Sequence, residues 1–207
     1  VGLLGPNGAG KTTCFYSIMG LVKPDGGRIE LDGQNITSLP MYRRAILGLG
    51  YLPQETSIFR GLTVEQNISA VLELAEPDKD ARAGRLEQLL DEFGLTRLRT
   101  SSAMALSGGE RRRCEIARAL AADPSIMLLD EPFAALGPAL KSEMLDLLDE
   151  VASATGAAVL MVTHDPADAQ RFAGQTVLVA EGVAQPPCET AALFANPPPA
   201  LAAYLGT

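Results

Sequence analysis

The feature that most constrains the fold is an eight-residue run near the start of the chain, Gly5-Pro6-Asn7-Gly8-Ala9-Gly10-Lys11-Thr12. It matches the pattern G-x-x-x-x-G-K-[ST] at every specified position, and it follows the short apolar run of residues 1–4. The pattern after it predicts a helix over residues 12–21, which the turn residues 23–27 end. A glycine-rich loop between a strand and a helix turns backbone N–H groups inward, so this run predicts a phosphate-binding loop.

Apolar runs of strand length alternate with helical patterns along the rest of the chain. Residues 28–31 and 47–52 are predicted as strands, and the continuous apolar runs 125–129 and 157–162 are typical of strands buried in a parallel sheet. Helical patterns cover residues 63–122, where four apolar side chains fall at i, i+3, i+4 and i+7: Leu86, Leu89, Leu90 and Phe93. A second such set is formed by Met144, Leu147, Leu148 and Val151. This order predicts an α/β fold with a mostly parallel sheet and an inserted helical subdomain.

The length of 207 residues fits a single domain. We expect its core over residues 1–53 and 116–183, its helical subdomain over about 54–115, and a short peripheral tail over 184–207, which contains five prolines. The chain opens on Val1 rather than Met and begins with what reads as the end of a strand, so we expect it to lack its own N-terminus.

Composition excludes several classes of function. A net charge of −8 argues against a nucleic-acid partner, and no apolar run reaches the roughly 18–20 residues of a membrane-spanning helix. The three cysteines lie far apart and the sequence has one histidine, so no His/Cys zinc cluster is expected. Free thiols in a reducing cytosol are the expected state of Cys14, Cys114 and Cys188.

Two acidic residues, Asp130 and Glu131, follow the apolar run 125–129. Open α/β sheets bind ligands at the carboxyl ends of their strands, so Asp130 is suited to hold Mg²⁺ and Glu131 to polarise an attacking water. Capping of a helix is the structural alternative for this pair. His164 also directly follows a predicted buried strand, which favours a functional role over the core position that a lone histidine usually takes.

A second anion-seeking loop is formed by Ser107, Gly108 and Gly109, which precede Glu110 and open a predicted helix. Two phosphate-seeking loops in one chain suggest that the second serves the nucleotide of another molecule.

Together these motifs resemble those of the ATP-binding cassette (ABC) ATPases. The phosphate loop, Gln54 after a strand, Leu-Ser-Gly-Gly-Glu, Asp130-Glu131 and Thr163-His164-Asp165 occur in that family's order over essentially the whole chain. The resemblance implies a P-loop NTPase (RecA-like) core, with ATP and Mg²⁺ as ligands.

The resemblance also implies the role of each residue. The phosphates of ATP would be bound by Gly5, Pro6, Asn7, Gly8, Ala9, Gly10, Lys11, Thr12 and Thr13. Mg²⁺ and water would be arranged by Thr12, Gln54 and Asp130, with Glu131 as general base and His164 on the γ-phosphate and the attacking water. Ser107, Gly108 and Gly109 would close over the ATP of a partner in a head-to-tail homodimer.

Two departures from the family pattern stand out. The family has an N-terminal antiparallel strand pair carrying an aromatic residue that stacks on adenine, and this chain begins after it. The loop after Glu131 usually ends in Asp, whereas here residues 134–137 end in Gly137, so we expect an altered contact across the dimer interface.

The transported cargo is indicated by two segments. Residues 1–133 resemble the ATPase of lipopolysaccharide export, and residues 134–207 are more similar to the ATPases of thiamine importers. The groove for the membrane subunits falls in the first segment, so the lead hypothesis is an ATPase peripheral on the cytoplasmic face of the bacterial inner membrane that powers lipopolysaccharide export. Thiamine import is the alternative, and an inactive fragment or a non-transport cassette protein is a hypothesis of another class.

The segment of residues 51–67 is rich in apolar side chains and poor in charge. Either these residues form the core of the helical subdomain, or some of them, Phe59 above all, stay exposed to seat a helix of the membrane subunits.

Overall fold

The computed structural model describes residues 1–134 and 136–206, and the chain forms two compact units. The first unit contains residues 1–49, 128–132 and 158–207, and the second contains residues 50–127 and 133–157. Each unit is considered separately below. The expected limits of core, helical subdomain and tail remain a prediction.

A mostly parallel sheet organises the first unit. β1 (Gly2–Leu4) lies between β6 (Ala158–Thr163) and β7 (Gln175–Ala180) and is parallel to both, with Leu3 opposite Val162 and Val177. The carboxyl half of β5 (Ile126–Asp130) lies on the other side of β6. The short strands β8 (Val183–Ala184) and β9 (Cys188–Glu189) pair antiparallel with β7. The parallel arrangement predicted from the buried apolar runs is confirmed; β7 has no counterpart among the predicted strands.

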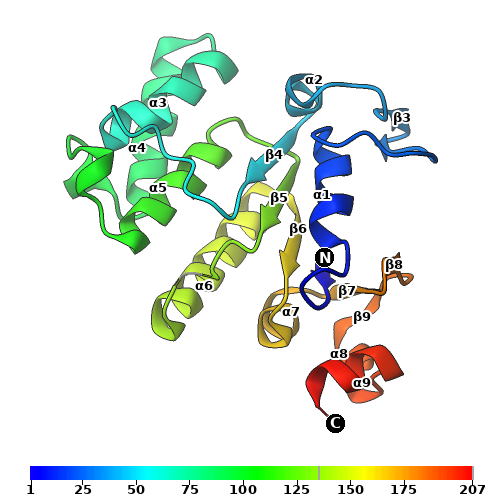
Figure 1. The fold of residues 1–207 in the computed structure, drawn as a ribbon. Helices are drawn as coiled ribbons and strands as arrows, with labels where there is room; N and C mark the ends of the chain where they lie inside the picture. The colour runs from blue at the N-terminus through cyan, green and yellow to red at the C-terminus, as the bar shows by residue number, and fades with distance from the viewer. Residues whose placement is uncertain (135, 207) are drawn as a thin grey trace. The chain divides into compact units, whose positions relative to one another are not determined.

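Short helices and one hairpin complete the first unit (Figure 1). The hairpin is formed by β2 (Glu30–Leu31) and β3 (Gln34–Asn35). The helices are α1 (Lys11–Met19), α2 (Met41–Ile46), α7 (Pro166–Phe172), α8 (Thr190–Ala195) and α9 (Pro199–Leu205). α1 ends at Gly20, which has a φ of 79° and donates its N–H to Ser17 O. This left-handed glycine is the usual termination of a helix.

A buried arginine connects α2 to the end of α1. Arg44 is 1% exposed, and its guanidinium donates to the carbonyl oxygens of Ser17 and Ile18 at 2.7 and 2.6 Å. It also donates to Leu39 O and Thr37 O at 2.9 and 3.0 Å. Because burial disfavours the charged form, it lowers the pKa of Arg44, and the four carbonyl oxygens offset that cost.

The C-terminal segment contributes apolar side chains to the core of the first unit. Leu193 of α8 and Leu201 of α9 are 7% and 0% exposed, and both join a cluster with Leu4 of β1 and Leu178 of β7. The prolines at 197–199 separate α8 from α9 and start α9, since proline at the first helical position loses no hydrogen bond. The segment therefore closes the apolar core beside β1.

The second unit is mainly helical, as the period-3.6 pattern predicts. It contains α3 (Val64–Ala75), α4 (Lys79–Glu92), α5 (Gly108–Leu120) and α6 (Pro138–Thr155), with short 3₁₀ turns at Thr96–Leu98 and Ala103–Ala105. α3 packs against α4 and α5. Of the predicted helical set, Leu89, Leu90 and Phe93 are at most 1% exposed.

One strand of the second unit approaches its neighbour closely. In β4 (Leu49–Leu52), a Cβ on Gly50 would lie 2.5 Å from Met127 Sδ in β5, so only glycine fits there.

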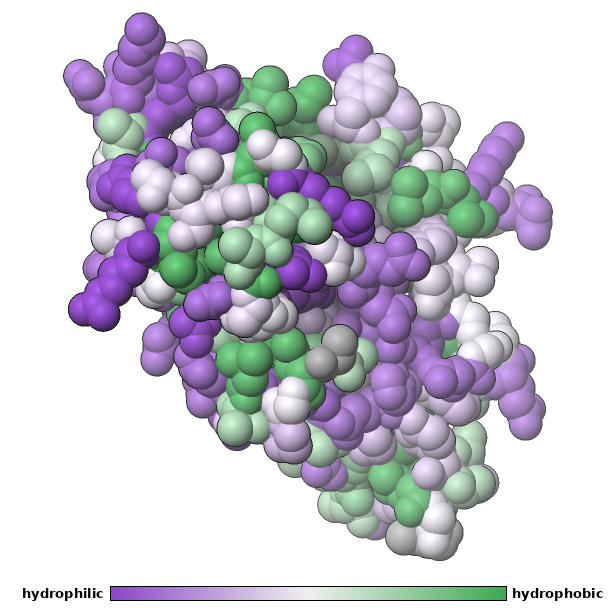
Figure 2. All heavy atoms as spheres, turned by 60° about the vertical axis from the view of Figure 1, so that its left-hand side comes forward, coloured by the Kyte–Doolittle hydropathy of each residue, from purple (hydrophilic) through white to green (hydrophobic). Residues whose placement is uncertain are grey.

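Among the described residues, no helix combines the length and apolar character needed to cross a membrane. On the face shown in Figure 2, hydrophobic residues form small patches separated by hydrophilic ones.

We predict that Leu201→Ala lowers the free energy of unfolding by about 2–5 kcal/mol, because it leaves a cavity beside Leu4 and Leu178. Leu74→Ala, at a side chain that is 90% exposed, is the control and should change the free energy of unfolding by less than about 0.5 kcal/mol. Urea unfolding of both variants measures this. Equal stability of the two would contradict the assignment of α9 to the core.

Candidate nucleotide site

The phosphate loop leaves β1 at a point where the backbone passes very close to β7. A Cβ on Gly5 would lie 2.1 Å from Val179 O, so the first residue of the loop must be glycine. Gly8 and Gly10 have φ values of 80° and 100°, a region that side-chain-bearing residues avoid. The N–H of Ala9 donates to Pro6 O at 3.2 Å and closes the turn. The predicted loop therefore has the tight backbone that its glycines require.

The start of α1 leaves its positive end available. No side chain caps this helix and its first turn has no acidic residue. Lys11 is 5% exposed, and its Nζ donates to Gly5 O at 2.7 Å and Pro6 O at 2.9 Å. Burial lowers the pKa of Lys11, and the negative charges of Glu131 and Asp130 oppose that shift. Thr12 and Thr13 are exposed on the same helix. An uncapped helix start beside a buried ammonium group fits the phosphates of a nucleotide.

The acid pair lies at the carboxyl end of β5. Asp130 is 3% exposed, and its pKa is raised by burial and by the charge of Glu131, while Lys11 opposes the shift. The Glu131 N–H donates to Val162 O of β6 at 3.0 Å, and Glu131 has a φ of 41°. A left-handed glutamate is strained by about 1–2 kcal/mol, which is the kind of strain that concentrates at functional sites.

Asp130 and Thr12 suit a magnesium ion only when a bound substrate supplies further oxygen ligands. A carboxylate destabilised by burial and the Thr12 hydroxyl are oxygen ligands of the kind that Mg²⁺ prefers, and Mg²⁺ usually completes its shell with phosphate oxygens and water. Over residues 1–134 and 136–206, no group of three or more His, Cys, Asp or Glu side chains could hold an ion by itself.

His164 faces the acid pair from the end of β6. Its Nδ1 lies 3.0 Å from Glu131 Oε1, with 43% of the His164 side chain and 14% of the Glu131 side chain exposed. The structure thus brings together Lys11, Asp130, Glu131 and His164 within the first unit. This grouping is the geometry that a water-activating site needs, with a base, an orienting group and an ammonium cation within one site.

The second unit holds the other predicted site residues. Ser107 caps α5: its Oγ accepts from the Glu110 N–H at 3.3 Å, and Glu110 Oε2 accepts from the Ser107 N–H at 2.8 Å. These hydrogen bonds lower the pKa of Glu110. A Cβ on Gly109 would lie 2.6 Å from Leu140 Cδ2, whereas nothing lies within 4 Å of one on Gly108. The α5 start is thus capped by its own glutamate, unlike the α1 start.

Gln54 is exposed just after β4, and a buried network holds the backbone on both sides of it. Arg112 donates to Pro53 O from both Nη atoms at 3.0 Å and to Glu115 Oε2 at 2.9 Å. Glu115 Oε1 accepts the N–H groups of Ser57 and Ile58 at 2.8 and 3.1 Å. In the sequence, Arg112 lies in a basic run, residues 111–113, that is typical of a solvated face. The i, i+3 spacing of Arg112 and Glu115 was the available signal.

Phe59 is the exposed member of the apolar segment. It is 47% exposed, whereas Leu52, Ile58 and Val64 are at most 7% exposed. Asn67 Oδ1 accepts the Phe59 N–H at 2.8 Å, and the Arg118 guanidinium lies 4.4 Å from the centre of the Phe59 ring. Phe59 is therefore held in an exposed position by its neighbours.

Gly137 caps α6 with extended backbone, and nothing lies within 4 Å of a Cβ placed on it. Ala135, in the same loop, lies outside the described residues. No backbone constraint in the structure requires a glycine at position 137.

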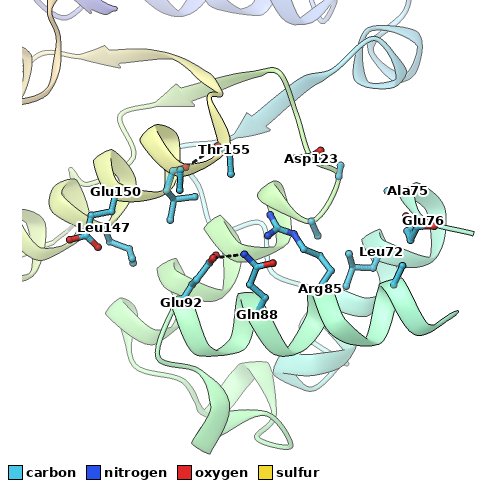
Figure 3. A pocket seen from close by; sticks show the side chains of 15 residues that line it. Leu72, Ala75, Glu76, Arg85, Gln88, Glu92, Asp123, Leu147, Glu150 and Thr155 are labelled. Carbon is cyan, nitrogen blue, oxygen red and sulfur yellow. Dashed lines mark hydrogen bonds between the residues drawn. The ribbon is translucent and has the colours of Figure 1, made fainter. Parts of the chain in front are cut away.

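A hollow of about 730 Å³ within the second unit contains none of the predicted site residues (Figure 3). It lies between α3, α4 and α6, with Leu72 and Val151 among its apolar residues. Arg85, Glu76 and Glu150 are among its charged ones. None of the residues that line this hollow belongs to the candidate nucleotide site.

Comparison with known proteins gives related sequences for most of the chain. A family model described as ABC transporter matches residues 1–134. A probable ABC transporter ATP-binding protein of Azorhizobium caulinodans is 61% identical over 165 residues, 80% of this chain. The lipopolysaccharide export system ATP-binding protein LptB of Haemophilus influenzae is 51% identical over 166 residues, 80% of this chain and 68% of that protein. The thiamine import ATP-binding protein ThiQ of Cereibacter sphaeroides is 48% identical over 210 residues, 100% of this chain and 88% of that protein.

Solved structures agree in fold. CbiO1 from Clostridium perfringens, described as part of an ABC transporter complex, has a TM-score of 0.85 over 94% of this chain and 78% of its own, at 28% identity. An ATP-binding cassette solved as a dimer in a post-hydrolysis state with ADP and Pi has a TM-score of 0.79 over 91% of this chain and 84% of its own, at 27% identity. This chain spans 58% of the A. caulinodans protein and 61% of a Rhizobium meliloti relative.

A glycine loop between a strand and a helix, with acids at the carboxyl end of a parallel sheet, defines a P-loop nucleotide-binding protein. Within that class, the family model and the relatives are specific. The chain belongs to the ABC transporter family and matches its ATP-binding proteins. The expected fold class and the membership of the ABC family are thereby confirmed.

We predict that Asp130→Asn stabilises the nucleotide-free protein at neutral pH, because the pKa of Asp130 is raised in the folded state. A raised carboxyl pKa means that stability falls as pH rises from the unfolded-state value through the folded-state value. The stabilisation by Asp130→Asn should therefore be complete above the folded-state pKa of Asp130. It should shrink as pH falls from that value toward the unfolded-state pKa. Urea unfolding at several pH values measures this, with Asp149→Asn on the exposed side of α6 as control. A destabilised Asp130→Asn at neutral pH would contradict the prediction.

Proposed function

We propose that the chain is an ATP-hydrolysing subunit of an ABC transporter. The observation that carries this proposal is the grouping of Lys11, Asp130, Glu131 and His164, with His164 Nδ1 3.0 Å from Glu131 Oε1. In this proposal the loop N–H groups and Lys11 bind the phosphates, and the carboxylate of Glu131 accepts a proton from the attacking water.

The remaining site residues complete the proposed chemistry. His164 orients Glu131 and contacts the γ-phosphate, and Gln54 helps to arrange the water. Thr12, Asp130 and Gln54 would hold Mg²⁺, which when bound neutralises developing charge on the phosphate oxygens. Thr13 and residues 5–10 line the phosphates, and the glycines admit them without side-chain clashes.

A head-to-tail homodimer is part of the proposal. Ser107, Gly108 and Gly109 would close over the ATP of the partner copy, and a related cassette solved as a dimer supports the expectation of a dimer. The chain would sit peripherally on the cytoplasmic face of the bacterial inner membrane, bound to transmembrane subunits. No role in nucleic-acid binding is proposed.

For the cargo, we propose lipopolysaccharide export. LptB of H. influenzae matches 80% of this chain at 51% identity, which supports this choice. Thiamine import is the second candidate, because ThiQ aligns with the whole chain at 48% identity.

Glu131→Gln should keep ATP binding and lose hydrolysis by about 10²- to 10⁴-fold, since it removes the general base but keeps side-chain size. Lys11→Ala should instead weaken ATP binding. Glu73→Gln, on an exposed position of α3, is the charge-matched control. Steady-state hydrolysis and nucleotide titration separate these effects. Near-normal turnover in Glu131→Gln would overturn the assignment of the base.

Phe59→Ala should reduce assembly with membrane subunits while leaving ATP binding unchanged, because an exposed aromatic anchor typically contributes about 2 kcal/mol or more to an interface. Leu74→Ala, which removes another exposed apolar side chain, should have no effect. The measurement is a pull-down with membrane subunits of a lipopolysaccharide exporter and, in parallel, of a thiamine importer. Retention by the thiamine-type subunits alone would reverse the choice of cargo.

A further inference from the structure

The last helix of the chain contacts the backbone of the candidate catalytic histidine. The hydroxyl of Tyr204, in α9, donates to the carbonyl oxygen of His164. Two features hold α9 in place: Leu201 is fully buried, and Tyr204 itself packs against the cluster that contains Leu4 and Leu178. The contact therefore rests on a packed helix.

This contact completes the fixation of one peptide group. The carbonyl oxygen of His164 and the N–H of Asp165 belong to the same peptide plane. The Asp165 N–H donates to Thr163 Oγ1 at 2.9 Å, and Thr163 in turn donates to Asp168 Oδ2 at 3.2 Å. With the Tyr204 hydroxyl on the other side, both polar atoms of this plane are hydrogen-bonded. A fixed plane restricts the ψ angle of His164, and with it the direction in which the imidazole leaves the backbone.

We propose that Tyr204 is a positioning residue that holds His164 in line with Glu131. This inference rests on the proposed ATPase function, and it gives the C-terminal helix a role in that reaction. His164 directly follows the end of β6, and 43% of its side chain is exposed. The 3.0 Å approach to Glu131 then depends on the backbone beneath the ring, which Tyr204 anchors.

The electrostatic surroundings keep the Tyr204 hydroxyl a donor. Burial raises the pKa of Tyr204, and the negative charges of Asp165 and Glu131 raise it further. Because the charge of Glu131, the proposed base, raises the pKa of Tyr204, the two side chains lie within electrostatic range of each other. The hydroxyl thus stays protonated at neutral pH and can donate continuously to His164 O.

Tyr204→Phe tests the proposal, because it removes the hydroxyl and keeps the ring that packs against the core. We expect kcat for ATP hydrolysis to fall about 2- to 12-fold, the factor that corresponds to one neutral hydrogen bond. KM for ATP should be unchanged, since the phosphate loop is untouched. Tyr42→Phe, at a tyrosine that is 63% exposed, is the matched control and should have no effect.

A double-variant cycle shows whether Tyr204 acts through His164. In a His164→Gln background, adding Tyr204→Phe should lower kcat no further. Additive losses would show that Tyr204 acts on something else, and unchanged kcat in Tyr204→Phe alone would also overturn the proposal.

The single histidine of the sequence gives a readout that does not need activity. In a tag-free protein, the imidazole resonances in NMR spectra report His164 alone. Tyr204→Phe should shift them, whereas Tyr42→Phe should not. Unchanged resonances would contradict the positioning role, even if the melting temperature fell. If the wild-type chain bound ATP without hydrolysing it, the proposed function would fail, and the NMR result would still decide the Tyr204 contact.

Discussion

The site depends on the position of β1, which lies between β6 and β7. β1 pairs with both strands, so its end is fixed before the phosphate loop begins. At that end only glycine fits, because of Val179 O. Parallel pairing also brings the carboxyl ends of β1, β5 and β6 to one edge, which carries Lys11, the acid pair and His164. Sheet register thus converts residues far apart in the sequence into neighbours.

Buried charges in this chain have two different uses. Arg44 and the Arg112–Glu115 pair are surrounded by backbone partners and hold loops in place. Lys11 and Asp130 are also buried, and burial displaces the pKa of each toward its neutral form, as it does for Arg44. Asp130 differs in lying near a second acid, Glu131, so the candidate site retains a repulsion that a bound cation can relieve.

Much of the fold was predictable because its signals are local. The glycine run, the buried apolar strands and the period-3.6 helices each specify an element through adjacent residues. What the sequence did not reveal depends on distant partners. The proline-rich composition of the C-terminal segment gives no sign that Leu201 joins the apolar cluster around Leu4. Arg112 belongs to a basic run, and only its contact with Pro53 O distinguishes it. Likewise, no periodic pattern indicates that Tyr204 reaches His164.

The left-handed backbone at Glu131 has a consequence for how this protein responds to selection. A glutamate with a φ of 41° is held in a conformation that glycine or asparagine adopts more easily. Laboratory evolution for heat resistance alone would therefore favour replacements at this position that relax the backbone while discarding the carboxylate. Thermostable descendants of this sequence should be screened for turnover as well as for folding. A replacement of Glu131 that stabilises the fold would remove the proposed catalytic carboxylate.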